Sequence, residues 1–151
     1  MNGDFKRRVL FVCIHNAARS QMAEAFLNRI GERYFEAESA GMDPTEINPL
    51  VVEVMAEVGI DLSGAKTKSV FDLYRSGEEY SYVITVCDEA HERCPLFPGP
   101  ARRISWNFQD PATFQGSREE TLVMTRKVRD EVRAKVEEFV RDFESRLESP
   151  T

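Results

Sequence analysis

The sequence predicts an α/β protein, a three-layer sandwich in which a four-stranded parallel sheet lies between two layers of helices. Short apolar runs alternate along the chain with longer segments whose apolar residues recur at helical spacing. Strands separated by helices form parallel sheets through right-handed crossovers, which place helices on both faces. The length of 151 residues, 42% of them hydrophobic, suits one domain over residues 1–151.

Four segments are expected to be strands. The run 9–12 is wholly apolar and of strand length, and the run 82–86 is rich in β-branched and aromatic residues. The runs 34–39 and 103–106 match the same pattern less fully, and the first of them is followed by a breaker, Gly41.

Three segments are expected to be helices. Residues 17–30 are rich in good helix formers, with apolar residues at helical spacing. Residues 49–58 begin at a proline, which favours the first turn of a helix, and are followed by Gly59. In residues 118–147 the apolar side chains fall mainly on one stripe, which predicts an amphipathic helix packed on the sheet.

Composition narrows the possible partners and location. No apolar run approaches the roughly 20 residues that span a bilayer, and the N-terminal residues lead into only a short apolar run. We therefore predict a cytoplasmic protein with no membrane contact. The formal net charge of −6 disfavours nucleic acid, which requires a continuous basic surface. Single cysteines are often only small buried residues, but three reduced thiols in a cytosolic chain make thiol chemistry worth testing.

Cys13 follows the first predicted strand and precedes a short loop that leads into a helix. Sites in open parallel sheets form at the carboxyl ends of strands, where Cys87 also lies. Loop amides and the positive end of the helix can surround an oxyanion, and Arg19 can add two parallel hydrogen bonds. The same field should lower the pKa of Cys13 from about 8.5 to roughly 4–7 and make it a nucleophile. The predicted oxyanion-binding loop consists of Ile14, His15, Asn16, Ala17, Ala18, Arg19 and Ser20.

A second cysteine followed six residues later by arginine occurs at Cys87 and Arg93, so this spacing alone is not specific. The surrounding residues separate the two segments. The loop after Cys87 contains three acidic residues, Asp88, Glu89 and Glu92. These would repel a bound oxyanion, whereas the loop after Cys13 contains no acidic residue. We therefore place the oxyanion in the first loop only.

The stretch from Cys13 to Glu24, with Asn16 and the string Arg19-Ser20-Gln21-Met22-Ala23-Glu24, closely resembles the arsenate reductases of the low-molecular-weight tyrosine phosphatase fold. Two further elements occur in the order of that family. They are Cys87 and Cys94, with six residues between them after a strand, and Asp110-Pro111 after residues 106–109. The resemblance extends over nearly the whole chain.

This resemblance implies an enzyme of arsenic detoxification that reduces arsenate to arsenite and needs neither a metal nor a cofactor. Cys13 would attack arsenate while Arg19 and the loop amides hold its oxygens, and Asp110 would protonate the departing hydroxide. Cys87 would then attack Cys13 and release arsenite, and Cys94 would leave a Cys87–Cys94 disulfide. That internal pair favours thioredoxin as reductant, with glutaredoxin or a small thiol such as mycothiol left open.

The spacing of Cys87 and Cys94 has a structural consequence. In a helix their Cα atoms would lie about 10 Å apart, beyond the roughly 7 Å limit for a disulfide. We therefore expect residues 87–97 to refold on oxidation. The proline-rich stretch 95–100 would limit how far the change spreads, and the exposed disulfide would be what thioredoxin recognises.

Several candidate residues have alternative interpretations. Ser20 could cap the helix or stabilise the thiolate, and Asp110 on its own is typical of a turn before proline. His15 is given no catalytic role. In some relatives the positions of Asn16, Glu24 and Ser39 line a monovalent-cation site. The further acidic ligand expected near residue 68 is missing here, so the ammonium of Lys66 or Lys68 could stand in for the ion.

Two other functions remain open. A low-molecular-weight phosphotyrosine phosphatase would need neither Cys87 nor Cys94, but such phosphatases carry tyrosines after Asp110-Pro111, where this chain has Ala112 and Thr113. Weak phosphatase activity would still fit. The second is a metal-binding module with soft ligands. Its ligands would be Cys87, His91, Cys94 and, as the fourth, Cys13.

Overall fold

The computed structural model describes residues 6–94, 97 and 99–148. The predicted α/β fold is confirmed, because four parallel strands form one sheet in the order β2-β1-β3-β4. The ends of the predicted domain, residues 1–5 and 149–151, lie outside the described residues. In chain order the elements are β1 (Arg7–Cys13), α1 (Arg19–Ile30), β2 (Phe35–Gly41), α2 (Pro49–Ala56), α3 (Val70–Arg75), β3 (Tyr82–Cys87), β4 (Arg102–Asn107), the 3-10 helix η2 (Pro111–Thr113) and α4 (Arg118–Glu148).

The central strand β1 lies between β2 and β3, with Val12 opposite Ala40 on one side and Thr85 on the other. The chain leaves β1 toward β2 and later returns to the opposite side of β1 as β3, so the strand order changes direction between these two strands. Ligands of open parallel sheets bind at the carboxyl ends of the strands at such a point. Cys13 ends β1 and Cys87 ends β3, so both cysteines lie there.

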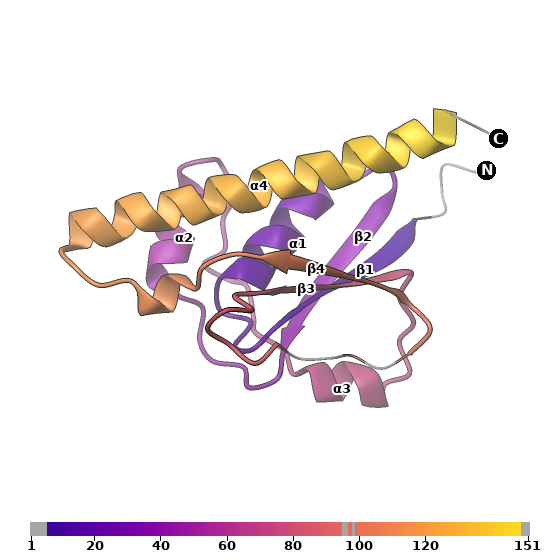
Figure 1. Ribbon diagram of the computed structural model, residues 1–151, viewed down its shortest axis with the longest axis horizontal. Coiled ribbons are helices and arrows are strands. Elements are labelled where there is room, and N and C mark those ends of the chain that lie inside the picture. Colours follow the sequence, from indigo (N-terminus) through magenta and orange to yellow (C-terminus); the bar gives the residue numbers. More distant parts are fainter. Residues whose placement is uncertain (1–5, 95–96, 98, 149–151) are drawn as a thin grey trace.

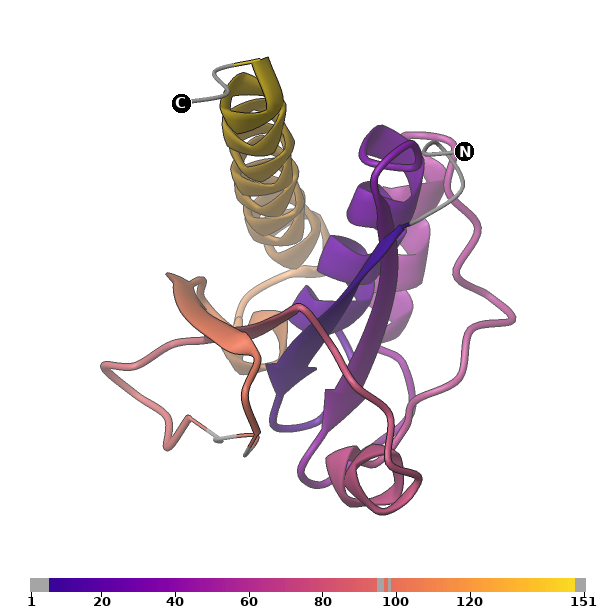
Figure 2. The same ribbon diagram turned by 90° about the vertical axis from the view of Figure 1, so that its right-hand side faces the viewer.

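Helices cover both faces of the sheet, as the two ribbon views show (Figures 1 and 2). Side chains alternate between the faces of a strand. In β1, Phe11 and Cys13 belong to the larger apolar core, which α1, α2 and α4 complete. Leu10 and Val12 face the other way, toward a smaller core that includes Val70 of α3. The thiol of Cys13 therefore lies on the side of the sheet that α1 covers.

Most predicted elements are confirmed with small shifts at their ends. The first helix begins at Arg19 rather than at residue 17, because residues 14–18 form the loop after β1. Helix α2 begins at a proline as predicted, and the Asn48 side chain caps it by accepting a hydrogen bond from the Leu50 amide. The prediction missed α3, which has six residues and is too short to show helical periodicity.

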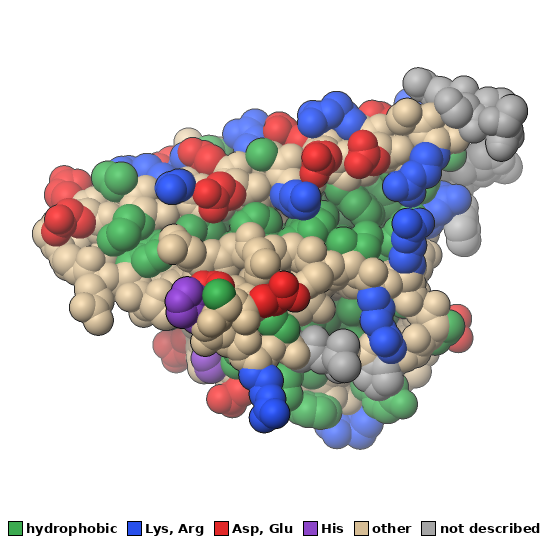
Figure 3. Space-filling model, in the orientation of Figure 1, with side chains coloured by type: hydrophobic (Ala, Val, Ile, Leu, Met, Phe, Trp, Pro, Cys, Tyr) green, Lys and Arg blue, Asp and Glu red, His purple; other side chains and the backbone are tan. Residues whose placement is uncertain are grey.

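The C-terminal helix α4 has 31 residues and begins with a capping box. The Ser117 hydroxyl accepts from the Glu120 amide, and the Glu120 carboxylate accepts from the Ser117 amide. The buried stripe of the helix contains Val128, Val132, Val136 and Val140. Basic and acidic side chains alternate along its outer face (Figure 3). Within the described part of the chain, no helix is both long enough and apolar enough to cross a membrane.

Candidate active site

The loop between β1 and α1 is held by its carbonyl groups. The carbonyls of Cys13, Ile14, His15 and Ala17 accept hydrogen bonds from backbone amides in the segment 42–48, at 2.7–3.2 Å. In a trans peptide the C=O and N–H groups point in opposite directions, so the N–H groups of these peptides face away from that segment. The amide of Asn16 accordingly donates to Sγ of Cys13 at 3.1 Å. The loop thus turns these amides away from the segment 42–48 and points that of Asn16 at the thiol, as an oxyanion site requires.

Asn16 fixes the shape of this loop. Its side chain is fully buried and its φ is 54°, in the left-handed region that asparagine tolerates better than most residues. Nδ2 donates to the hydroxyls of Ser20 and Ser39 at 2.8 and 2.9 Å. Oδ1 accepts from the Lys68 amide at 2.9 Å and from Nε2 of Gln21 at 3.1 Å. One side chain therefore joins the loop to α1, to β2 and to the segment before α3.

Gly41, at the end of β2, lies directly against the same loop. A Cβ atom at this position would lie 2.6 Å from the carbonyl oxygen of Ile14 and 2.8 Å from the amide nitrogen of Asn16. Both contacts are with backbone, which cannot move away as a flexible side chain can. Only glycine therefore lets the loop close down on the sheet at this point.

The thiol of Cys13 is buried, and its Sγ lies 2.9 Å from the hydroxyl of Ser20. Burial raises the pKa of Cys13, and the opposing effects of Ser20, the Arg19 charge and the Asn16 amide do not outweigh it. Our prediction of a lowered pKa is therefore wrong for this form of the protein. The physical reason lies in the surroundings: the thiol is out of water, and the charge of Arg19 is already neutralised by Glu92.

Arg19 begins α1 and its side chain is 3% exposed. Its Nη1 and Nη2 donate to the two carboxylate oxygens of Glu92 at 2.6 and 2.9 Å, and Nη1 also donates to the Phe108 carbonyl at 3.1 Å. Oδ2 of Asp110 lies 3.5 Å from Nη2. Nε is buried and has no hydrogen-bond partner among the described residues. An oxyanion in the loop would supply the acceptor that this nitrogen lacks.

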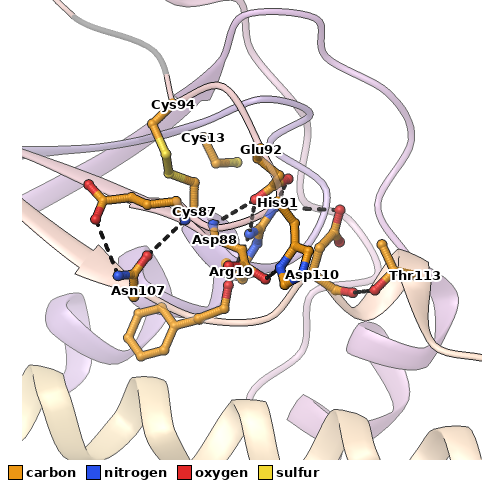
Figure 4. A network of polar contacts seen from close by, with 12 residues as sticks. Cys13, Arg19, Cys87, Asp88, His91, Glu92, Cys94, Asn107, Asp110 and Thr113 are labelled. Atoms are coloured by element: carbon orange, nitrogen blue, oxygen red, sulfur yellow. Dashed lines mark hydrogen bonds and ion pairs between the residues drawn. A yellow bond between two sulfur atoms is a disulfide. The ribbon is translucent and has the colours of Figure 1, made fainter.

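The interaction of Arg19 with Glu92 was not predicted. From the sequence, the acidic loop after Cys87 was expected only to repel an anion. The two residues are 73 positions apart, and no local pattern relates them. Figure 4 shows that the loop carries this carboxylate to the guanidinium.

Cys87 and Cys94 form a disulfide, and Cys13 is a free cysteine. Their Cα atoms lie 6.1 Å apart, and the residues between them form turns rather than a helix, as the geometric argument required. Cys87 is fully buried, whereas Cys94 is partly exposed. Refolding between reduced and oxidised states stays a prediction. Pro95, Leu96 and Pro98, which were expected to limit it, lie outside the described residues.

Asp110 precedes η2 and caps it, with its Oδ1 accepting a hydrogen bond from the Ala112 amide at 2.9 Å. A cleft of about 410 Å³ lies between this turn and the oxyanion-binding loop. The residues that line it include Cys13, His15, Ala18, Arg19, Asp110 and Ala112. The structure therefore brings the predicted thiol, guanidinium and carboxylate together at one opening.

The remaining candidates lie near this cleft. The carboxylate of Glu24 accepts a hydrogen bond from Ser39 at 2.6 Å, and Nζ of Lys68 lies 3.9 Å from it, where the ammonium was suggested to replace a cation. Nδ1 of His15 lies 3.0 Å from the Asp43 carbonyl oxygen. The proposed metal-binding set is disfavoured, because two of its four ligands are the cysteines of the disulfide.

Known proteins resemble the chain over most of its length. The family model described as low molecular weight phosphotyrosine protein phosphatase matches residues 8–149. The arsenate reductase of Shouchella clausii (strain KSM-K16) is 38% identical over 135 residues, which are 89% of this chain and 95% of the relative.

Two solved structures agree with this. The arsenate reductase from Archaeoglobus fulgidus DSM 4304 superposes with a TM-score of 0.72 at 30% identity, over 87% of this chain and 98% of that chain. The thioredoxin-dependent arsenate reductase of Corynebacterium glutamicum gives a TM-score of 0.64 at 30% identity, over 92% of this chain and 62% of that chain. The match of the family model, together with these relatives, confirms the predicted resemblance: the chain belongs to the low molecular weight phosphotyrosine protein phosphatase family.

Proposed function

We propose that this protein is an arsenate reductase that reduces arsenate to arsenite through three cysteines and is returned to its dithiol form by thioredoxin. The observation that carries the proposal is the Cys87–Cys94 disulfide next to a free thiol, Cys13, at the carboxyl ends of adjacent strands. A phosphatase needs the free thiol and the oxyanion-binding loop but has no use for the other two sulfurs. The arsenate reductases at 30% identity or more support the same assignment.

In the first step, the thiolate of Cys13 attacks arsenic(V) and displaces hydroxide, which Asp110 protonates to water. Arg19 and the loop amides hold the remaining oxygens and stabilise the charge that develops on them. Burial of Cys13 opposes its deprotonation. Formation of the thiolate therefore depends on the Ser20 hydroxyl, the Asn16 amide and the cationic Arg19, which all favour it.

In the second step, the thiolate of Cys87 attacks Sγ of Cys13. The sulfur–arsenic bond breaks, and its electron pair leaves with arsenic as arsenite. In the third step, the thiolate of Cys94 attacks Sγ of Cys87 and releases the thiolate of Cys13. The two electrons gained by arsenic thus come from the thiols of Cys87 and Cys94, and the disulfide form of the protein is the product of these three steps.

Thioredoxin as the reductant is supported by two observations. Cys94 is partly exposed, so an external thiol can reach the disulfide, and one structural relative is named as thioredoxin-dependent. We place the reaction in the cytoplasm, where thiols are kept reduced. The small residue Ala112 at the cleft suits an inorganic anion better than the tyrosine expected beside an aromatic substrate.

The proposal is tested by arsenate-dependent oxidation of NADPH in the presence of thioredoxin and thioredoxin reductase. Cys13→Ser, Cys87→Ser and Cys94→Ser should each abolish arsenate turnover. Hydrolysis of a small aryl phosphate should be lost only in Cys13→Ser, because phosphoryl transfer needs no relay. Arsenate turnover that persists in Cys87→Ser or Cys94→Ser would contradict the relay. A wild type that hydrolyses the aryl phosphate but does not turn over arsenate would leave the phosphatase assignment.

A further inference from the structure

The guanidinium of Arg19 is occupied by a carboxylate of its own chain. Glu92 accepts two parallel hydrogen bonds from Nη1 and Nη2, at 2.6 and 2.9 Å, in the arrangement by which arginine binds an oxyanion. Figure 4 shows the pair beside Cys13 and the disulfide. Glu92 thus binds the same charged group that the proposed function assigns to arsenate.

This contact is well sheltered from water. The side chain of Glu92 is 13% exposed and that of Arg19 is 3% exposed. Oε1 of Glu92 also accepts a hydrogen bond from the Asp88 amide at 2.6 Å. Burial by itself raises the pKa of Glu92, but the hydrogen bonds from Arg19 and Asp88 outweigh it, so the pKa is lowered and the side chain is ionised at neutral pH.

The position of Glu92 depends on the redox segment, because the residue lies between the two cysteines of the disulfide. The backbone amides of His91 and Glu92 both donate to the Asp88 carbonyl, which makes a tight turn within the closed loop. The disulfide and the turn together fix the segment that carries the carboxylate. A segment that refolds on reduction would carry Glu92 with it.

We propose that Glu92 is an internal competitor of the oxyanion: when the Cys87–Cys94 disulfide closes, its carboxylate pairs with Arg19 and lowers the affinity of the site for an oxyanion. The oxidised protein then binds a new oxyanion more weakly, at a stage when Cys13 has no reduced partner thiols to complete the reaction. The inference rests on the proposed function, since it takes the loop after Cys13 as the oxyanion site.

Competition follows from charge. Glu92 accepts hydrogen bonds from the two terminal nitrogens of Arg19, and Nε, which has no acceptor among the described residues, remains free to donate to an oxyanion. The carboxylate of Glu92 nevertheless neutralises the cation that would hold that oxyanion. An arsenate or phosphate dianion would also meet the negative charge of Glu92 close to Arg19. Both effects weaken oxyanion binding in the disulfide form and disappear when the loop opens.

The test measures binding of inorganic phosphate by calorimetry in a Cys13→Ser background. That change leaves Cys87 and Cys94 as the only cysteines, so the oxidised sample contains a single possible disulfide. The oxidised protein should bind phosphate about tenfold or more weakly than the reduced protein. Adding Glu92→Gln should bring the oxidised affinity to within about threefold of the reduced one, because the amide keeps the shape of the side chain but not its charge.

Glu89→Gln is the matched control. Glu89 lies in the same loop, but its carboxylate accepts hydrogen bonds from Ser105 and Asn107 at 3.0 and 3.3 Å. This variant should keep the full difference between the redox states. Glu92→Gln should also make the disulfide easier to reduce, by about tenfold in its equilibrium with a thiol buffer, because the contact stabilises only the closed loop.

Each other result overturns the inference. If the reduced Cys13→Ser protein binds phosphate but oxidised Glu92→Gln still binds it weakly, Glu92 is not the competitor and the proposed function is unaffected. If reduced Glu92→Gln has itself lost phosphate binding, Glu92 supports oxyanion binding rather than opposing it. If the reduced Cys13→Ser protein binds no phosphate at all, the loop after Cys13 is not an oxyanion site, and the proposed function is wrong as well.

Discussion

Replacing Asn16 tests the claim that one buried side chain holds the oxyanion-binding loop in shape. Asn16→Ala removes four hydrogen bonds: Nδ2 to Ser20 and Ser39, and Oδ1 from Gln21 and the Lys68 amide. It also places a residue with a Cβ but no polar group at φ 54°. Asn16→Gly loses the same four bonds but adopts this φ without strain.

The expected loss of stability follows from these contacts. A buried hydrogen bond contributes about 1 kcal/mol net, so the four bonds of Asn16 predict a loss of about 4 kcal/mol in either variant. The left-handed conformation adds about 1 kcal/mol for alanine but not for glycine. A typical domain has only about 5–15 kcal/mol in total, so both variants should be marginally stable.

Urea unfolding followed by circular dichroism measures both variants against the wild type. With a slope of about 1–3 kcal/mol per molar urea, the midpoint should fall by about 2 M for alanine and by somewhat less for glycine. A loss below about 2 kcal/mol in Asn16→Ala would refute the assignment of these bonds. Equal losses in the two variants would refute the argument from φ.

Three further predictions concern the loop and its thiol. Gly41→Ala should lower kcat/KM for arsenate by at least about tenfold, because its Cβ would displace the backbone of Ile14. Gly64→Ala, which adds a Cβ with nothing within 4 Å, should leave kcat/KM unchanged, and similar values for the two would contradict the steric argument. In the oxidised protein the raised pKa of Cys13 predicts that alkylation by iodoacetamide becomes fast only above the pH at which an ordinary thiol ionises. Glu92→Gln should move this profile to lower pH, since an unpaired Arg19 favours the thiolate; a shift to higher pH would contradict the pairing.

Much of the fold could be predicted from local patterns. The apolar runs of β1 and β3 have the length and composition of buried strands, and the apolar stripe of α4 is long enough to show helical spacing. The alternation of strands with helices implies a parallel sheet. Parallel strands bring their carboxyl ends to one edge, so the amino-acid sequence alone was enough to place Cys13 and Cys87 together. The loop after Cys13 was recognisable because small residues and an arginine follow a strand directly.

The parts that were missed depend on contacts between distant residues. The pairing of Arg19 with Glu92 joins the start of α1 to the loop after β3, and these approach only after the sheet has formed. The raised pKa of Cys13 depends on how deeply the folded chain buries the thiol, which the amino-acid order does not state. Hydrogen bonds such as those of Asn16 to Ser39 and Lys68 likewise come from three separate segments, so the sequence indicated the residue but not its partners.

The hydrogen bonds of Asn16 hold the shape of the oxyanion-binding loop independently of the segment 88–93 after β3. The oxyanion-binding loop is hydrogen-bonded through Asn16 to the sheet and to α1. The segment after β3 is held separately, by the disulfide and by the side chains of Glu89 and Glu92. Substitutions in residues 88–93 can therefore change how this segment contacts an electron donor while Asn16 keeps the shape of the oxyanion-binding loop. An exchange of residues 88–93 between members of this family should change which electron donor is preferred. The affinity of the reduced protein for its oxyanion should stay the same.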